Sequence, residues 1–242
     1  MCTVSVVPRA DGFRLLCNRD EQRQRPAALA PTRHSVDNTT AVYPIDPVGG
    51  GTWVGVNDAG LAVALLNRSP SGMSMPPSYE LSSRGLIAVA LLAIRTVQEA
   101  SAACASLTLP MFNPFRVVVV QGKRAATLTS DGRTLTLLSF ELLRPFMVTS
   151  SSLGDDLVTA PRAALFERLV VNAHRAGDER RVLDGQARFH AHRWPDRGAV
   201  SVMMERPDAH TVSRTAVSVS GRDIELHYDA LDGTTQPSEH LP

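Results

Sequence analysis

The sequence predicts an α+β fold in a single domain that covers residues 1–242. Segments rich in β-branched residues come first, an alanine- and leucine-rich segment follows, and further blocks of strands, helices and strands complete the chain. Separate blocks of strands and helices are typical of α+β folds, whereas regular strand–helix alternation indicates a parallel sheet. A length of 242 residues fits one domain of this kind, and no internal repeat or low-complexity linker divides it.

Turn residues and runs of β-branched or helix-forming residues give the expected elements in order. Strands are expected at residues 2–7, 13–20, 52–57, 60–67, 115–121, 125–130, 134–139, 145–151, 199–204, 211–218 and 223–228. Helices are expected at residues 81–107, 160–176 and 178–191. The Arg- and Pro-rich stretch 21–38 is expected to be a surface loop, and the tail 232–242 is expected to be frayed.

The charge balance excludes several classes of partner. The chain has 25 Lys and Arg residues and 24 Asp and Glu residues, which gives a formal net charge of +1. These charges are spread evenly, so we expect neither a nucleic-acid-binding face nor a polybasic segment for an anionic membrane. The longest apolar run, residues 86–94, is too short to span a bilayer. The composition leaves the oligomeric state open.

The cysteines and histidines give no pattern of a metal site. Cys2, Cys17 and Cys104 are odd in number and lack CxxC spacing, which argues against a disulfide framework and a zinc site. A reducing compartment fits best, so the protein is expected to be cytoplasmic. Cys17 and Cys104 are expected to be core residues. His190 and His192 are expected at the surface, and no metal or other cofactor is expected.

Cys2 is the strongest candidate for a nucleophile. Removal of Met1 would leave Cys2 with a free α-amine, and we expect the protein to begin at Cys2. An α-amine has a pKa of about 7.7–8.0 and a free thiol one of about 8.5, so the amine can accept the thiol proton near neutral pH. No catalytic histidine is then needed. The alternative interpretation is that Cys2 is an ordinary small core residue.

The first predicted hairpin brings charged residues close to Cys2. If Val7 faces Phe13 across the turn, Cys2 lies opposite Asn18, and a shift of one residue would place it opposite Cys17 or Arg19. The cation of Arg19 would then stabilise a thiolate, and Asp20 could hydrogen-bond the α-amine. The alternative is that this charged strand end is a solvated rim.

The second predicted hairpin offers a hydrogen-bond donor. With a two-residue turn between Asn57 and Gly60, Asn67 faces Gly50 in a glycine run. The side-chain amide of Asn67 and the bare backbone N–H groups of that run could stabilise an oxyanion. The alternative is that Asn67 caps the following loop while the glycines only permit a sharp entry to the strand.

Five segments carry a resemblance to a known family. They are Met-Cys-Thr at residues 1–3, Asn-Arg-Asp-Glu at 18–21, Gly-Gly-Thr-Trp-Val-Gly-Val-Asn at 50–57, Gly-Leu-Ala at 60–62 and Leu-Asn-Arg at 66–68. The sequence resembles the NRDE family, also called the transport and Golgi organisation protein 2 family, most specifically in its first 70 residues. That resemblance implies an αββα four-layer sandwich like that of N-terminal nucleophile hydrolases of the choloylglycine and penicillin V acylase type.

The resemblance also implies a set of site residues. In the group that this family resembles, a cysteine nucleophile, an arginine, an aspartate, two asparagines and a late arginine form the site. The matching catalytic residues in this sequence are Cys2, Arg19, Asp20, Asn67 and Arg214. Ser151 stands where related sequences usually carry the second asparagine, and it is expected to bind substrate. Asn18 is also expected to bind substrate.

Two classes of function follow from this resemblance. The first is an amidohydrolase or acyltransferase that acts on a small-molecule amide or acyl substrate through a thioester on Cys2. The second is a carrier that holds haem or a lipid such as acyl-CoA in the same pocket. Cys2 would then be either a ligand or a residue that has lost its catalytic role. The residues Arg19, Asp20 and Asn67 favour the enzyme, because a carrier has no need of a group that orients an α-amine.

Overall fold

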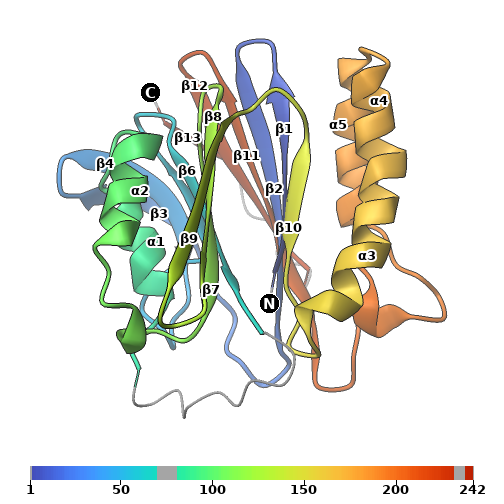
Figure 1. The fold of residues 1–242 in the computed structure, drawn as a ribbon, viewed down its shortest axis with the longest axis horizontal. Coiled ribbons are helices and arrows are strands. Elements are labelled where there is room, and N and C mark those ends of the chain that lie inside the picture. The colour runs from blue at the N-terminus through green and yellow to red at the C-terminus, as the bar shows by residue number, and fades with distance from the viewer. Residues whose placement is uncertain (1, 70–80, 232–237, 242) are drawn as a thin grey trace.

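Two antiparallel sheets lie face to face, and helices cover the outer face of each sheet (Figure 1). The computed structural model describes residues 2–69, 81–231 and 238–241. Helices α1 (Gly85–Leu92) and α2 (Val97–Ala105) lie on one side of the molecule, and α3 (Asp155–Phe166), α4 (Asn172–Arg175) and α5 (Glu179–His190) lie on the other. The layers therefore follow the order αββα that the resemblance implied.

The first sheet joins the two ends of the chain. Its strands, in spatial order, are β10 (Phe146–Thr149), β1 (Cys2–Arg9), β2 (Gly12–Gln22), β11 (Ala209–Ser220), β12 (Asp223–Ala230) and β13 (Glu239–Leu241). The second sheet contains β3 (Leu29–Val36), β4 (Thr39–Ile45), β5 (Val54–Asn57), β6 (Ala62–Asn67), β7 (Phe115–Gln121), β8 (Arg124–Ser130) and β9 (Leu135–Glu141). The β7–β9 meander occurs where it was expected, and all the pairings are antiparallel.

Strand β1 is buried on both faces because it lies between the second sheet and a helical layer. Alternate side chains of a strand point to opposite faces. Cys2, Val4 and Val6 belong to the core between the two sheets. On the other face, Val7 packs with the α3–α5 layer, and Ser5 hydrogen-bonds His190 of α5. This alternation decides which residues of β1 and β2 can reach a site between the sheets.

The expected helix at 81–107 is two helices. Helix α1 ends at Leu92 and α2 begins at Val97, with Thr96 at its N-cap. The Thr96 hydroxyl accepts a hydrogen bond from the Glu99 N–H and donates one to the Glu99 carboxylate. A threonine followed three residues later by glutamate is a signal for a helix start, and it outweighs the continuous apolar pattern.

Three further expectations were wrong. Residues 21–38 were expected to be a loop but contain β3, whose polar, half-exposed sequence hides the alternation typical of strands. Residues 199–204 were expected to be a strand but contain the 3-10 turn Gly198–Val200. In the tail, β13 pairs with β12 instead of fraying, while residues 232–237 and 242 lie outside the described structure.

Both hairpins differ by one residue from the expected register. Ala10 and Asp11 form a two-residue turn, so Val7 pairs with Arg14 and Cys2 pairs with Arg19, which is one of the two shifted alternatives. In the second hairpin the loop has three residues, and Gly60 ends it with φ +70°. A three-residue loop with a left-handed glycine is a common hairpin connection, and only glycine adopts that conformation without strain.

Candidate active site

Cys2 begins β1 and faces the space between the two sheets. Cys2 is buried, with 4% of its surface exposed to solvent. Arg19 lies directly opposite on β2, and Cys17 lies diagonally opposite because it pairs with Val4. Cross-strand neighbours share a face of the sheet, so Cys2, Cys17 and Arg19 project into the same space. The predicted juxtaposition of Cys2 and Arg19 is therefore present.

The two buried thiols differ in acidity. A hydrogen bond from the Cys17 thiol lowers the pKa of Cys2, although burial opposes this effect. The same hydrogen bond, together with burial, raises the pKa of Cys17 well above its usual value. The charge of Arg19 also lowers the pKa of Cys2, and that of Asp20 raises it. Cys2 is therefore the more acidic of the two thiols, and Cys17 is the one that acts as hydrogen-bond donor.

Arg19 is held firmly beside Cys2. Its guanidinium lies 4.1 Å from the centroid of the Trp53 ring and donates a hydrogen bond to Asp46 at 3.0 Å. Glu21 lies 3.5 Å from the same nitrogen atom of Arg19. Burial alone would raise the pKa of Asp46, but a hydrogen bond from Arg25 and the charges of Arg19 and Arg25 lower it overall. Asp46 therefore stays ionised and fixes the cation of Arg19.

Ser150 contacts the backbone of Cys2 on both sides of the residue. The Cys2 N–H donates to Ser150 Oγ at 3.2 Å, and the Ser150 N–H donates to the Cys2 carbonyl at 3.0 Å. Ser150 is 1% exposed and directly follows β10, which pairs with β1. The nitrogen that contacts Ser150 Oγ is the one that removal of Met1 would turn into an α-amine.

Asp20 lies one residue beyond Arg19 and therefore on the opposite face of β2. Thr211 Oγ1 donates a hydrogen bond to its carboxylate at 2.6 Å. Burial raises the pKa of Asp20, although the charge of Arg162 and the bond from Thr211 oppose that rise. The charge of Asp20 reaches Cys2. Its contact with the α-amine stays a prediction.

A cavity of about 410 Å³ opens beside Cys2. Asn67, at the end of β6, is half-buried and lines this cavity. Its strand partner is Phe115 of β7 rather than the expected Gly50, because the pairing of β5 with β6 begins only at Val54. Gly51 of the glycine run also lines the cavity. The donor and the glycines therefore meet in the cavity without pairing in the sheet.

Asn18 and Ser151, the two implied substrate-binding residues, have structural hydrogen bonds instead. Asn18 is fully buried, donates to the carbonyls of His190 and Val202, and shares a 2.8 Å hydrogen bond with His190 Nδ1. Ser151 Oγ accepts a hydrogen bond from the Leu153 N–H. Neither residue lines the cavity beside Cys2.

Arg214 is also not brought to Cys2. It pairs with Asn18 across β2 and β11 and therefore lies on the face that the helices cover. Its guanidinium contacts Asp229 at 2.5 Å.

His190, expected at the surface, is fully buried in that helix-covered layer, and burial lowers its pKa to about 3.

Sequence reasoning missed three residues of the site: Ser150, Asp46 and Arg84. Arg84 lines the cavity of Cys2 from the start of α1, and Asp46 lines it from the end of β4. Neither residue forms part of a local motif with Cys2. Ser150 carried a signal, because it precedes Ser151, the position that the resemblance marked, but the resemblance pointed to its neighbour.

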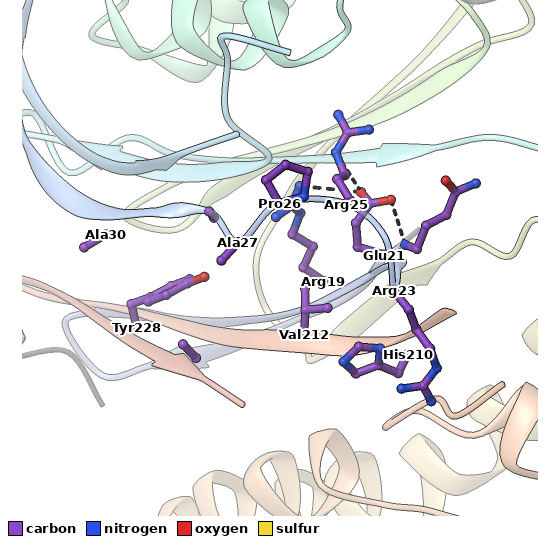
Figure 2. A pocket seen from close by; sticks show the side chains of 13 residues that line it. Arg19, Glu21, Arg23, Arg25, Pro26, Ala27, Ala30, His210, Val212 and Tyr228 are labelled. Atoms are coloured by element: carbon purple, nitrogen blue, oxygen red, sulfur yellow. Dashed lines mark hydrogen bonds and ion pairs between the residues drawn. The ribbon is translucent and has the colours of Figure 1, made fainter. Parts of the chain in front are cut away.

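A second pocket, of about 190 Å³, shares Arg19, Glu21 and Arg25 with the cavity of Cys2 (Figure 2). Small apolar residues and Tyr228 form much of its remaining wall.

Within the described residues, no group of three or more His, Cys, Asp or Glu side chains could hold a metal ion. No helix in the same part of the chain combines the length and apolar character that a bilayer crossing requires.

Solved structures share this architecture. The Caenorhabditis elegans N-acylethanolamine-hydrolyzing acid amidase ortholog superposes with a TM-score of 0.61 at 15% identity, over 100% of both chains. Penicillin V acylase from Agrobacterium tumefaciens gives 0.55 at 14% identity, over 96% of this chain and 83% of its own. The C2A mutant of conjugated bile acid hydrolase from Clostridium perfringens gives 0.53 at 10% identity, over 100% of this chain and 92% of its own.

These likenesses define the class: the chain has the αββα fold of the N-terminal nucleophile hydrolases. The sequence model of the Transport and Golgi organisation 2 family matches residues 1–182, and the chain belongs to this family. No curated protein sequence matches the chain. At 10–15% identity, the solved structures establish the fold.

Proposed function

We propose that the protein is an amidohydrolase that cleaves a carbon–nitrogen bond other than a peptide bond in a small molecule, through a thioester on Cys2. The observation that carries the proposal is the thiol of Cys2, whose pKa a hydrogen bond from Cys17 lowers, in a cavity that Asn67 also lines. A thiol that is more acidic than usual and open to a cavity is typical of a nucleophilic cysteine.

The reaction needs only groups of this chain and water. The α-amine of Cys2, exposed by removal of Met1, takes the thiol proton, and the sulfur forms a bond to the amide carbon. The Asn67 side-chain amide donates to the resulting oxyanion. The carbon–nitrogen bond then breaks, and the leaving amine receives the proton from the α-ammonium. Water then attacks the thioester carbon and gives one proton to the α-amine. The carbon–sulfur bond breaks, the sulfur receives that proton from the α-ammonium, and the carboxylic acid is released.

Ser150 and Asp20 are proposed to orient the α-amine. Ser150 Oγ already accepts a hydrogen bond from the Cys2 nitrogen, and the negative charge of Asp20 acts on the same residue. An amine held by an acceptor presents its lone pair in a fixed direction, which favours proton transfer from the adjacent thiol.

The carrier alternative has less support in the cavity wall. Nε1 of Trp53 and Oδ1 of Asn113 are buried and have no hydrogen-bond partner among the described residues. Unsatisfied polar atoms favour a ligand with donors and acceptors, such as an amide, over an apolar lipid tail. A haem iron would need an axial ligand such as His, Cys, Met or Tyr, and among the described residues that line the cavity only Cys2 is of such a type.

The test is release of amine from a panel of N-acyl amides, including an N-acylethanolamine and a penicillin, the substrate types named for the structural neighbours. Cys2→Ala is expected to lower kcat by about a thousandfold or more, whereas Cys104→Ala, in a separate core, leaves it unchanged. Rapid acid quenching and intact mass should reveal an acyl group on Cys2. Added hydroxylamine would separate hydrolysis from acyl transfer, because an acyltransferase would form the hydroxamate preferentially.

Absence of turnover and of any acyl adduct, together with a spectral shift on adding haem or a thermal shift with acyl-CoA, would instead favour the carrier.

A further inference from the structure

The cavity of Cys2 contains an arginine that the proposed reaction does not use. Arg84 immediately precedes α1 and is half-buried in the cavity wall. Its Nη1 donates a hydrogen bond to the carbonyl of Pro114 at 2.9 Å. Among residues 2–69, 81–231 and 238–241, this is its one hydrogen bond, and no carboxylate of those residues lies within 4.0 Å of its guanidinium. Most of its N–H donors therefore remain for a ligand.

The other two arginines of the cavity are neutralised by carboxylates. Arg19 and Arg25 both contact Asp46, at 3.0 and 2.7 Å, and both lie beside Glu21, at 3.5 and 3.6 Å. The described wall thus carries three arginines and two carboxylates. The excess positive charge resides on Arg84.

The backbone at Arg84 is held in place by a glycine contact. Gly51 and Gly85 approach so closely that a Cβ atom at Gly51 would lie 2.3 Å from the Gly85 carbonyl carbon. The Thr52 N–H also donates to the Gly85 carbonyl at 3.2 Å. The strand entry that carries Gly51 therefore fixes the segment that carries Arg84, and an anion would meet a guanidinium whose backbone is already positioned.

Burial supports the same role. It lowers the pKa of Arg84 to about 10, even though the charges of Cys2 and Glu21 act in the opposite direction. A buried cation that lacks a carboxylate partner loses hydration without compensation, and an anionic ligand would supply that compensation. Cys2 and Arg84 also line the same cavity of about 410 Å³, so one small molecule can contact both groups.

We propose that Arg84 is a specificity-determining residue that binds a carboxylate of the substrate within a few bonds of the carbon that Cys2 attacks. The preferred substrates are then amides that carry a carboxylate, of which N-acyl amino acids are the simplest. This assignment of substrate class rests on the proposed amidohydrolase function, but the cation site itself can be tested without any turnover.

Two alkylating reagents provide that test. Iodoacetate and iodoacetamide react at the same carbon, and iodoacetate alone carries a carboxylate beside it. A change in thiolate fraction alters both rates alike, so their ratio at Cys2 reports the binding of the carboxylate. Rates at Cys2, resolved by peptide mass, are compared for the wild type, Arg84→Gln, Arg84→Lys and Arg95→Gln. Arg95 is exposed near the other end of α1 and pairs with Asp58, so its removal matches the loss of charge away from the site.

The ratio of iodoacetate to iodoacetamide rates is expected to fall at least about fivefold in Arg84→Gln, which corresponds to loss of one charge-assisted hydrogen bond. Arg84→Lys should retain part of the ratio, and Arg95→Gln all of it. An unchanged ratio in Arg84→Gln, or equal loss of both rates, would overturn the proposal. If Arg84→Gln fails to fold, Arg84→Lys takes its place, because lysine lacks the planar, two-donor guanidinium. A wild-type ratio of the two rates in folded Arg84→Lys would then overturn the proposal.

Turnover separates this proposal from the proposed function. N-acylglycine is compared with the uncharged N-acylglycinamide of the same acyl chain. A preference in kcat/KM for N-acylglycine that disappears in Arg84→Gln supports both proposals. Cleavage of the two compounds with equal kcat/KM in both proteins would contradict the role of Arg84 and leave the amidohydrolase intact. An Arg84-dependent alkylation ratio without cleavage of any amide would support the anion site and contradict the amidohydrolase.

Discussion

Cys17 lies diagonally across the β1–β2 hairpin from Cys2, and hydrogen bonding between their thiols lowers the pKa of Cys2 while raising that of Cys17. The donor and the nucleophile therefore lie on one hairpin, joined by a two-residue turn. Cys17, expected to be an inert core residue, is buried as predicted but also supports the site.

Cys17→Ala is expected to raise the pKa of Cys2, because the largest stabilising contact of its thiolate is lost. The rate of Cys2 alkylation by iodoacetamide at pH 7 should fall, by roughly tenfold for each pKa unit. A pH–rate profile between pH 6 and 10 measures this shift. Cys104→Ala is the control, because burial raises the pKa of Cys104 to about 12 and its side chain lies in the core between α1, α2 and the second sheet. Identical profiles for wild type and Cys17→Ala would exclude this role.

Arg19→Ala should also slow Cys2 alkylation, but less than Cys17→Ala does. The charge of Arg19 lowers the pKa of Cys2 less strongly than the Cys17 hydrogen bond, and Asp20 acts against it. Ion pairs with Asp46 and Glu21 further reduce the field of Arg19 at the sulfur. The same profile ranks the two variants, and a larger effect of Arg19→Ala would contradict this order.

Ser150→Ala should lower kcat/KM on a cleaved amide by about tenfold, the equivalent of one hydrogen bond. The reason is that Ser150 Oγ contacts the Cys2 nitrogen at 3.2 Å. Ser5→Ala serves as the matched control, since Ser5 is a buried serine of β1 that hydrogen-bonds His190 on the helix-covered face. Comparable losses in both variants would mean that the effect comes from general destabilisation of the sheet.

Purified protein is expected to lack Met1, because the α-amine of Cys2 is the base in the proposed reaction. Intact mass measures this directly. Predominant retention of Met1 would contradict a self-contained nucleophile, and Cys2 would then need a separate base.

The stability of the fold should depend on pH through His190. Burial, with smaller contributions from the charges of Arg14, Arg214 and Arg162, lowers its pKa from 6.5 to about 3. Between these pH values the unfolded chain binds a proton that the folded chain does not. The free energy of unfolding therefore falls as the pH drops from about 6.5 towards 3, by up to about 1.4 kcal/mol per pH unit from this group.

Urea unfolding of wild type and His190→Gln between pH 7 and 4 measures that contribution. The variant is expected to be less stable at pH 7, because the bonds of His190 to Ser5 and Asn18 change, but to lose stability less steeply as the pH falls. Parallel slopes for the two proteins would contradict a neutral, buried His190.

Local sequence was enough to predict the β1–β2 hairpin and the β7–β9 meander, because short turns with polar or glycine residues bring neighbouring strands together. It was not enough for β3, whose pairing partner is needed to stabilise a polar strand. Of the predicted site residues, Cys2, Arg19 and Asn67 line one cavity. Asn18, Ser151 and Arg214 do not line it, and they have partners elsewhere in the protein.

The sequence by itself determined the class of fold and the hairpin that carries Cys2. The tertiary structure decided which side chains face Cys2. In a strand each step of one residue reverses the face, so the shift from Asn18 to Arg19 opposite Cys2 directed Arg19 into the site and Asn18 into the helix-covered layer. Asp46, Arg84 and Ser150 come from distant segments. The packing of one sheet on the other brings Asp46 and Arg84 to the cavity of Cys2, and the pairing of β10 with β1 brings Ser150 to its backbone.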